Sequence, residues 1–255
     1  MELHFEASGS GDPLIILHGL FGSLDNWRIV SARLAQRFTV FALDQRNHGR
    51  SPHAEQMDYV LMAEDVQQFL KGRGLGKASV LGHSMGGKTA MQLALLHPGS
   101  VAKLIVADIA PRPYPPRHER MLAGMLALDL GHFETRSQME AALAPAVPDL
   151  ATRQFLLKNV VRSEGTGFHW RMGVTQIQTN YRRLTDTVHG LGPFTNPVLF
   201  IRGANSDYLS ESDIPEIQRC FPKAQLKTVP DADHLLHVQK PELFVRLVIE
   251  FLLDA

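Results

Sequence analysis

The sequence predicts an α/β fold, with a doubly wound, mostly parallel sheet and a mainly helical cap inserted after the strand that ends near Asp108. Short apolar runs recur without alternating with polar residues, which is typical of strands buried on both faces of a parallel sheet. Amphipathic patterns of helical period separate several of these runs, as in doubly wound folds. Between about residues 117 and 188 only helical patterns remain.

Five apolar runs are predicted to be strands of the sheet, and a sixth segment, Gln225 to Val229, reads as its last strand. Most of the runs end at glycine, histidine, aspartate or arginine, so polar groups are expected at the carboxyl edge of the sheet, where open α/β folds bind ligands. The five runs are Leu14 to Leu17, Thr39 to Leu43, Ala78 to Leu81, Val101 to Val106 and Val198 to Ile201.

Three segments between or after these runs are predicted to be helices that cover the sheet. Met57 to Lys71 carries an amphipathic pattern with one polar interruption, and Lys88 to Leu96 has small and apolar residues at helical spacing. The chain ends in Pro241 to Leu253, in which six apolar residues form one stripe. Pro241 suits the first turn of that helix, where its missing N–H has no partner to lose.

The segment after Asp108 interrupts the alternation of strands and helices. Pro111 to Pro116 is too rich in proline for a helix or a central strand. Helical patterns follow on either side of a break near Gly165-Thr166-Gly167, and the strand signal resumes only at Pro197. We therefore expect residues 1–111 and 192–255 to form the core. Residues 112–191 are expected to form a helical cap over the carboxyl edge, as an insertion and not an independent domain.

Composition restricts the classes of function that the chain can have. Lysine plus arginine equals aspartate plus glutamate at 26 each among 255 residues, so no electrostatic footprint for nucleic acid or an anionic membrane is present. No uninterrupted apolar run approaches the ~20 residues of a membrane-spanning helix, and residues 1–6 lack the pattern of a secretory signal. The single Cys220 excludes an internal disulfide and is expected to be a packing residue. These features predict a soluble cytoplasmic protein.

The segment Gly82-His83-Ser84-Met85-Gly86-Gly87 carries the strongest chemical signal. A G-x-S-x-G sequence between a strand and a helix is the nucleophile elbow, which presents a serine hydroxyl at the top of a parallel sheet. Its glycines let two stretches of backbone approach closely and tolerate the strained turn. Ser84 is therefore the predicted nucleophile.

A serine hydroxyl needs a base, and histidine has a pKa suited to that role near neutral pH. Hydrolases with this elbow order their catalytic residues as serine, acid and histidine, so the base should follow the last strand. His234 lies in the loop after that strand and is the predicted base, whereas His237 belongs to the approach to the final helix. The predicted oxyanion donors are the backbone N–H groups of Met85, after the nucleophile, and Leu20, after the first apolar run.

Four motifs together resemble an α/β-hydrolase, and more narrowly the YbfF-type bacterial esterases. They are H-G-L-F-G-S at residues 18–23, D-Q-R-N-H-G-R-S-P at 44–52, G-H-S-M-G-G-K at 82–88 and D-I-A-P at 108–111. The resemblance covers essentially the whole chain and is weakest in the cap. It implies a serine hydrolase that acts on small-molecule carboxylic esters, with thioesters such as acyl-CoA also in range, and it implies no metal and no cofactor.

Two aspartates compete for the role of the acid that orients His234. Many α/β-hydrolases place this acid after the strand that ends at Arg202-Gly203, but Ser206 occupies that position here and Asp207 follows it. Asp108, within D-I-A-P, stands where the YbfF-type resemblance implies the acid. We favour Asp108 and keep Asp207 as the competing candidate.

The remaining motif residues divide between the substrate site and its supporting loops. Phe21, His83, Met121 and Met125 are candidates to line the substrate site, the two methionines for an acyl chain. Within residues 44–52, the stretch Asn47 to Pro52 is interpreted as turn chemistry, and the charged side chains of the segment are expected to pair among themselves and brace the loop beside the site.

An esterase is the leading functional hypothesis, and two classes of alternative stay open. One keeps Ser84 but cleaves another bond, as a carbon–carbon hydrolase or a perhydrolase does. The other is a hydrolase-fold protein that binds a ligand with little turnover. Dehalogenases and epoxide hydrolases of this fold carry aspartate at the elbow and are disfavoured by Ser84.

Overall fold

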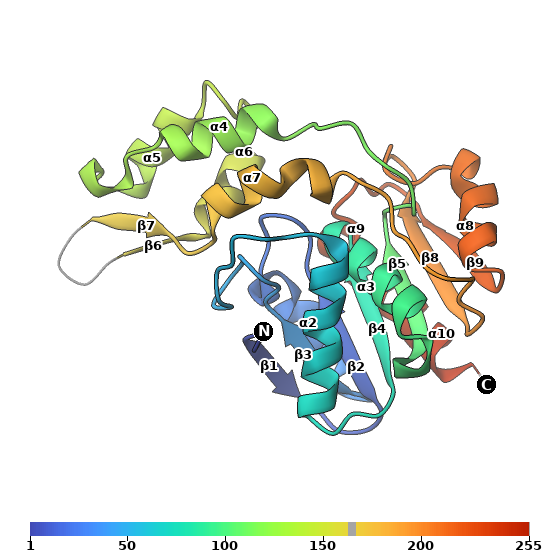
Figure 1. Cartoon of the computed structure of the whole chain (residues 1–255). Coiled ribbons are helices and arrows are strands. Elements are labelled where there is room, and N and C mark those ends of the chain that lie inside the picture. The colour runs from blue at the N-terminus through green and yellow to red at the C-terminus, as the bar shows by residue number, and fades with distance from the viewer. Residues whose placement is uncertain (163–166, 255) are drawn as a thin grey trace.

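The computed structural model describes residues 1–162 and 167–254, and within them a seven-stranded sheet forms the centre of the molecule (Figure 1). The strand order is β1-β3-β2-β4-β5-β8-β9, and every neighbouring pair except β1–β3 is parallel. The predicted α/β class with a mostly parallel sheet is confirmed. The strands are β1 (Phe5–Ser8), β2 (Pro13–Leu17), β3 (Thr39–Leu43), β4 (Ala78–His83), β5 (Val101–Ala107), β8 (Val198–Gly203) and β9 (Ala224–Val229).

Strand β1 was not among the predicted strands. It pairs antiparallel with β3 at the edge of the sheet, from Phe5 opposite Leu43 to Ser8 opposite Val40. An edge strand has one free side, and three of the four residues of β1 are exposed. Such a strand carries no continuous apolar run, so the pattern that predicts central strands does not detect it.

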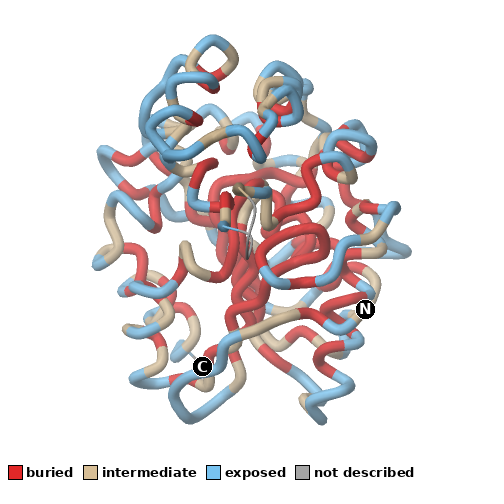
Figure 2. The backbone as a smooth tube through the Cα atoms, turned by 90° about the vertical axis from the view of Figure 1, so that its left-hand side faces the viewer, coloured by how far each residue is buried: buried red, intermediate tan, exposed pale blue. Residues whose placement is uncertain are grey.

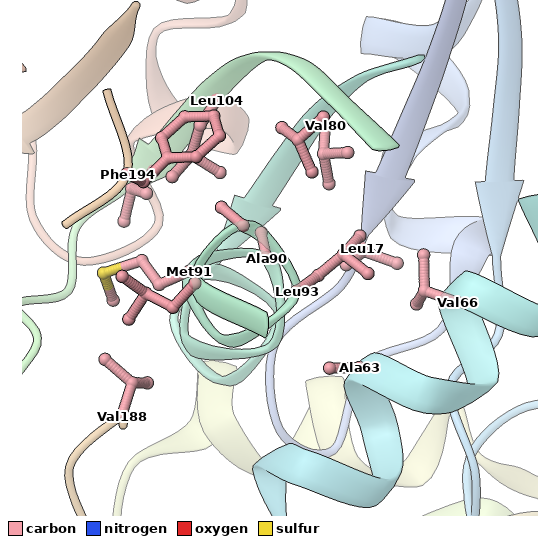
Figure 3. Packing of buried hydrophobic residues seen from close by; sticks show 14 of the residues in the cluster. Leu17, Ala63, Val66, Val80, Ala90, Met91, Leu93, Leu104, Val188 and Phe194 are labelled. Atoms are coloured by element: carbon pink, nitrogen blue, oxygen red, sulfur yellow. The ribbon is translucent and has the colours of Figure 1, made fainter. Parts of the chain in front are cut away.

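Helices cover both faces of the sheet, as the sequence predicts. On one face α2 (Tyr59–Gly72) and α3 (Met85–Leu96) pack against the strands, together with α8 (Ile214–Cys220). Figure 3 shows Leu17, Val80 and Leu104 of the sheet meeting apolar side chains of α2 and α3. On the other face lie α1 (Arg28–Leu34), α9 (Leu236–Gln239) and α10 (Pro241–Leu253). The described part of the chain also contains the 3-10 helices η1 (Leu24–Trp27), η2 (Pro98–Ser100), η3 (Leu130–His132) and η4 (Glu211–Asp213).

A smaller body of helices lies above the sheet in Figure 1 and is formed by the segment between β5 and β8. Its own apolar cluster continues onto the core through Phe21 and Met85, which pack with Leu122 and Ile177. Figure 2 shows that buried backbone is concentrated in the sheet, whereas much of the upper body is exposed. Its elements are α4 (Glu119–Ala127), α5 (Arg136–Leu143), α6 (Leu150–Leu157), β6 (Val160–Arg162), β7 (Phe168–Trp170) and α7 (Val174–Leu184).

The short ribbon β6–β7 corrects the expectation of purely helical patterns in this segment. The two strands pair antiparallel, with Val160 opposite Trp170 and Arg162 opposite Phe168. Val160 stands at helical spacing from Leu156, but α6 ends at Leu157 and Val160 begins β6. Strands of three residues are too short for a period of two to be recognised. Gly165 and Thr166, part of the predicted break, lie outside the described residues.

Cys220, the last residue of α8, is half-buried against the apolar core, and burial raises the pKa of its thiol, as expected for a packing residue. Across residues 1–162 and 167–254, no helix combines the length and the apolar character that crossing a membrane requires.

Candidate active site

Ser84 lies between the end of β4 and the start of α3 in a strained backbone conformation, with φ 52° and ψ −118°. Two glycines make this turn feasible. A Cβ atom on Gly82 would lie 2.1 Å from the Gly86 carbonyl oxygen, and one on Gly86 would lie 2.3 Å from the carbonyl oxygen of Leu17. Both distances are far below van der Waals contact, so the G-x-S-x-G pattern reflects close backbone packing around the serine.

The loop after β2 approaches Ser84 closely. A Cβ on Gly19 would lie 2.9 Å from His83 Nδ1 and 3.4 Å from Ser84 Cβ, so only glycine fits there without displacement. Among the hydrogen bonds of the described residues, none has the backbone N–H of Leu20 or of Met85 as its donor. Met85 is the first residue of the 12-residue helix α3, whose N-terminus favours negative charge. The two predicted oxyanion donors are thus free and border one cavity with Ser84.

Asp108 is fully buried at the end of β5 and lies against His234 in the loop after β9. The distance from His234 Nδ1 to Asp108 Oδ2 is 2.8 Å. The backbone N–H of Gly203 donates to Oδ1 at 3.0 Å, and the Ser206 hydroxyl donates to Oδ2. The carboxylate therefore accepts three hydrogen bonds, which fix its orientation toward the imidazole.

The structure does not bring the competing candidate, Asp207, to His234. Its carboxylate pairs with Arg117 at 2.7 Å, and 69% of its side chain is exposed. Ser206, which occupies the alternative acid position in the sequence, supplies a hydroxyl to Asp108 instead. No role was predicted for Ser206. The available signal was that Ser206 occupies the position after Arg202-Gly203 where many α/β-hydrolases carry the acid.

The ring of His83 lies between those of His234 and His237 in the contacts of the site. His83 Nε2–H donates to the backbone carbonyl of His234 at 2.8 Å, and both His234 and His237 have ring centroids 4.6 Å from that of His83. Burial lowers the pKa of His83 well below its ordinary value and the pKa of His237 to about 3, so both rings are neutral at neutral pH. The Trp27 ring stacks on His237 with centroids 4.3 Å apart. His237 is thus a buried packing residue.

The segment of residues 44–52 braces the loop that carries Leu20. Asp44 accepts hydrogen bonds at 2.8 Å from the backbone N–H groups of Leu24 and Arg50. A Cβ on Gly49, which has φ +56°, would lie 2.0 Å from the Asp44 carboxyl carbon. The Phe21 backbone N–H donates to His48 Nε2 at 3.3 Å, which ties the loop after β2 to this segment.

The charged side chains of this segment do not pair among themselves, contrary to the expectation. The Arg46 guanidinium is buried and donates to Asp65 of α2 at 2.6 Å, and Arg50 lies 3.6 Å from Glu6 of β1. The loop is therefore tied to the neighbouring elements of the core. Asp65 and Glu6 lie outside the motif, so the sequence of the motif alone could not predict these ion pairs.

Two cavities meet at Ser84. The smaller has a volume of about 50 Å³ and the larger of about 390 Å³, and Leu20, Ser84, His118 and Tyr208 line both. Three of the predicted lining residues, Phe21, His83 and Met121, border the larger cavity.

Met125 does not line either of these cavities. Its side chain is fully buried in the apolar cluster of the cap helices, although its helical spacing from Met121 suggested a shared role. The expectation for Met125 is therefore corrected: it is a packing residue inside the cap.

Lys88, one turn after Ser84 in α3, was not singled out as a site residue. Its side chain is only 1% exposed, and its ammonium donates to the backbone carbonyls of Arg112, at 2.8 Å, and Asp186. These carbonyls belong to the two chain segments that connect the cap to the core. Lys88 also lines the smaller cavity, and burial lowers its pKa to about 7. The available signal was a lysine that ends the serine-containing motif and begins the predicted helix of small and apolar residues.

Comparison with known proteins agrees with this architecture. The Xenopus laevis protein named sn-1-specific diacylglycerol lipase ABHD11 is 37% identical, and the alignment covers 98% of this chain and 83% of the relative. Esterase YbfF of Escherichia coli is 34% identical over 96% of this chain and 94% of its own length. A solved structure described as a marine microorganism esterase superposes with a TM-score of 0.95 at 43% identity, covering 98% of this chain and 99% of that one.

These similarities confirm the resemblance to the YbfF-type esterases that the motifs predicted. Residues 12–241 also match the family model described as alpha/beta hydrolase fold, which is most of the chain. With its seven-stranded sheet and its strand–serine–helix turn, the chain belongs to the α/β-hydrolase family.

Proposed function

We propose that this protein is a hydrolase of carboxylic esters, with thioesters as further substrates, and that Ser84, His234 and Asp108 form its catalytic triad. One observation carries the proposal: the buried Asp108 carboxylate lies 2.8 Å from His234 Nδ1, and His234 shares a cavity with Ser84. A nucleophile, a base and an oriented acid are the parts that acyl transfer to serine requires.

The Asp108–His234 contact determines which ring nitrogen acts as the base. A carboxylate accepts hydrogen bonds, so Nδ1 carries the proton and Nε2 presents a lone pair. Nε2 takes the Ser84 proton as Oγ attacks the acyl carbon, and the imidazolium that forms is stabilised by Asp108. His234 then gives this proton to the departing oxygen or sulfur.

The tetrahedral intermediate places a negative charge on the former carbonyl oxygen. The free backbone N–H groups of Leu20 and Met85 are suited to donate to it. Each such donor is worth roughly 2.7–4 kcal/mol in other enzymes, and the N-terminus of α3 adds a favourable dipole. Water then attacks the acyl-enzyme with His234 as base, and Ser84 is regenerated.

The relatives named above are called an esterase, a lipase and a marine esterase, which supports hydrolysis of an ester by this chain too. We also propose that residues 112–191 act as a cap inserted into a core of residues 1–111 and 192–255. Cap residues such as Met121 and His118 border the cavities at Ser84, as a substrate-enclosing role requires.

An active-site probe tests the proposal. A fluorophosphonate should label the wild-type protein at one serine, and p-nitrophenyl butyrate should be hydrolysed. Ser84→Ala should lose the label and the hydrolysis, whereas Ser212→Ala, at an exposed serine of η4, should retain both. Hydrolysis by Ser84→Ala at a rate near that of the wild type would refute the mechanism.

A further inference from the structure

The two cavities at Ser84 differ in which catalytic groups they contain. Ser84 and Leu20 line both of them. Met85 lines only the smaller cavity, whereas His234 lines only the larger one. The ring of Tyr208 stacks on His234 with centroids 3.8 Å apart and stands where the cavities meet. The active site is therefore asymmetric around the nucleophile.

Ester hydrolysis relates this asymmetry to the two halves of the substrate. The general acid must reach the departing oxygen or sulfur within hydrogen-bond distance, so the leaving group has to occupy the cavity that His234 lines. The acyl carbon is held by Ser84 while its oxygen faces the N–H groups of Leu20 and Met85, which both border the smaller cavity. The acyl chain then extends away from His234.

We propose that the smaller cavity is the acyl site and the larger cavity the leaving-group site, so that the preferred substrates are short-chain acyl esters or thioesters of large, apolar alcohols or thiols. This assignment rests on the proposed function and specifies its substrate class. In the reaction, Ser84 Oγ bonds to the acyl carbon as the bond to the alcohol oxygen or thiol sulfur breaks. The proton that His234 removes goes to that atom, and water then releases a short carboxylic acid.

The size of the smaller cavity limits the acyl chain. A volume of about 50 Å³ holds roughly three to five water-sized groups, which corresponds to a chain of about two to four carbons. Its walls are fixed by hydrogen bonds. The Tyr59 hydroxyl donates to the Leu184 carbonyl at 2.6 Å, and Lys88 is held by two backbone carbonyls. Because these hydrogen bonds hold the lining residues in place, the cavity does not expand easily for a longer acyl chain.

The larger cavity suits a bulky apolar leaving group. Its volume of about 390 Å³ falls within the range of roughly 300–1,000 Å³ that is usual for drug-sized ligands. Phe21, Trp27 and Phe155 give it an aromatic lining. At its rim Leu235 and Val238 are 39% and 55% exposed, which extends the apolar surface toward solvent.

Two crossed series of esters test the assignment. In the first, the alcohol is p-nitrophenol and the acyl chain runs from acetate to octanoate; in the second, the acyl group is butyrate and the alcohol grows from methyl through benzyl to naphthylmethyl. For the wild type we expect kcat/KM to fall by about tenfold or more from butyrate to octanoate and to rise by about tenfold or more along the alcohol series.

Variants of each cavity separate the two halves. Leu184→Ala enlarges the smaller cavity and should raise the octanoate-to-butyrate ratio by about tenfold, while the ratios within the alcohol series stay within about twofold. Ile109→Val is a milder enlargement that guards against misfolding of the first variant. Val238→Trp, at the exposed rim of the larger cavity, should reduce kcat/KM for large alcohols only.

The outcomes distinguish the assignment from the function on which it rests. Preference of the wild type for octanoate, or a change of the acyl series in Val238→Trp, would overturn the assignment of the cavities while Ser84-dependent hydrolysis stands. Hydrolysis that persists in Ser84→Ala would instead contradict the proposed function, and lack of turnover of every ester would contradict both.

Discussion

Replacement of Lys88 by methionine should remove a specific pH dependence of stability. The Lys88 ammonium is buried against the rings of Tyr114 and Tyr59, with Nζ 4.8 and 5.4 Å from their centroids. Burial lowers its pKa from 10.5 to about 7, opposed by the nearby Asp186 and reinforced by Arg112. A base with a lower pKa in the folded chain binds fewer protons there than in the unfolded chain, so stability rises with pH between the two values.

The expected size follows from the two pKa values. A full unit of difference is worth about 1.4 kcal/mol. Between about pH 7.5 and pH 9.5 the unfolded chain keeps the Lys88 proton and most folded molecules lack it, so linkage raises the free energy of unfolding by roughly 2 kcal/mol. Lys88→Met has no such group. The stability of the wild type relative to this variant should therefore grow by that amount across the range.

Urea unfolding at several pH values, followed by far-UV circular dichroism, measures this difference. Burial also raises the pKa of Tyr59 and Tyr114, but that contribution is common to wild type and variant. Gln92→Met is the matched control, because Gln92 lies one turn further along α3 and binds the backbone of His189 without carrying a titratable group. A difference for Lys88→Met that is flat, or that falls with pH, would refute the reasoning.

Three further predictions concern the acid of the triad, the turn at Ser84 and the cap, and the first two each have a control substitution. Asp108→Asn should lower kcat/KM for p-nitrophenyl butyrate by about 10³–10⁴-fold, whereas Asp207→Asn should change it less than about threefold; similar values for both would contradict the choice of acid. Gly86→Ala should destabilise the fold by about 3 kcal/mol or more in urea unfolding, because its Cβ would lie 2.3 Å from a β2 carbonyl oxygen, while Gly76→Ala meets no atom within 4 Å and should cost below about 1 kcal/mol. Met125→Ala should lower the free energy of unfolding by about 2–5 kcal/mol yet leave the acyl-length profile unchanged, and an altered profile would return Met125 to the substrate site.

The parts of the site that could be predicted from sequence are those built from local pattern. The strand before Ser84, the helix after it and the glycines at 82 and 86 lie within one short segment. The spacing of the two glycines around Ser84 follows from the close backbone contacts that the turn requires. His234 was also accessible, because the order of strands along the chain places the loop after β9 at the carboxyl edge.

Contacts between distant segments could not be predicted in the same way. Asp108 and Asp207 both follow strands that end at one edge of the sheet, and only the folded chain brings Asp108 to 2.8 Å from His234 while Asp207 turns to Arg117. Lys88 likewise depends on carbonyls 24 and 98 residues away. Hydrophobic periodicity within one segment cannot predict contacts between residues that lie so far apart in the sequence.

The cap was the least predictable region for a related reason. Met121 and Met125 are one helical turn apart in α4, so their spacing assigns them to one face. Met121 is half-buried at the wall of the larger cavity, whereas Met125 is fully enclosed by neighbouring cap helices. The difference is set by tertiary packing around the two ends of the helix, which the spacing does not carry.

Trapping the acyl-enzyme tests whether Ser84 is the nucleophile, on which the whole mechanism depends. The protein is mixed with excess p-nitrophenyl butyrate, quenched in acid during the first turnover, and digested for mass spectrometry. The account predicts a burst of about one p-nitrophenol per active site and a butyryl group on the peptide that contains Ser84. Steady hydrolysis with no acylated peptide, or with the butyryl group on another residue, would contradict it.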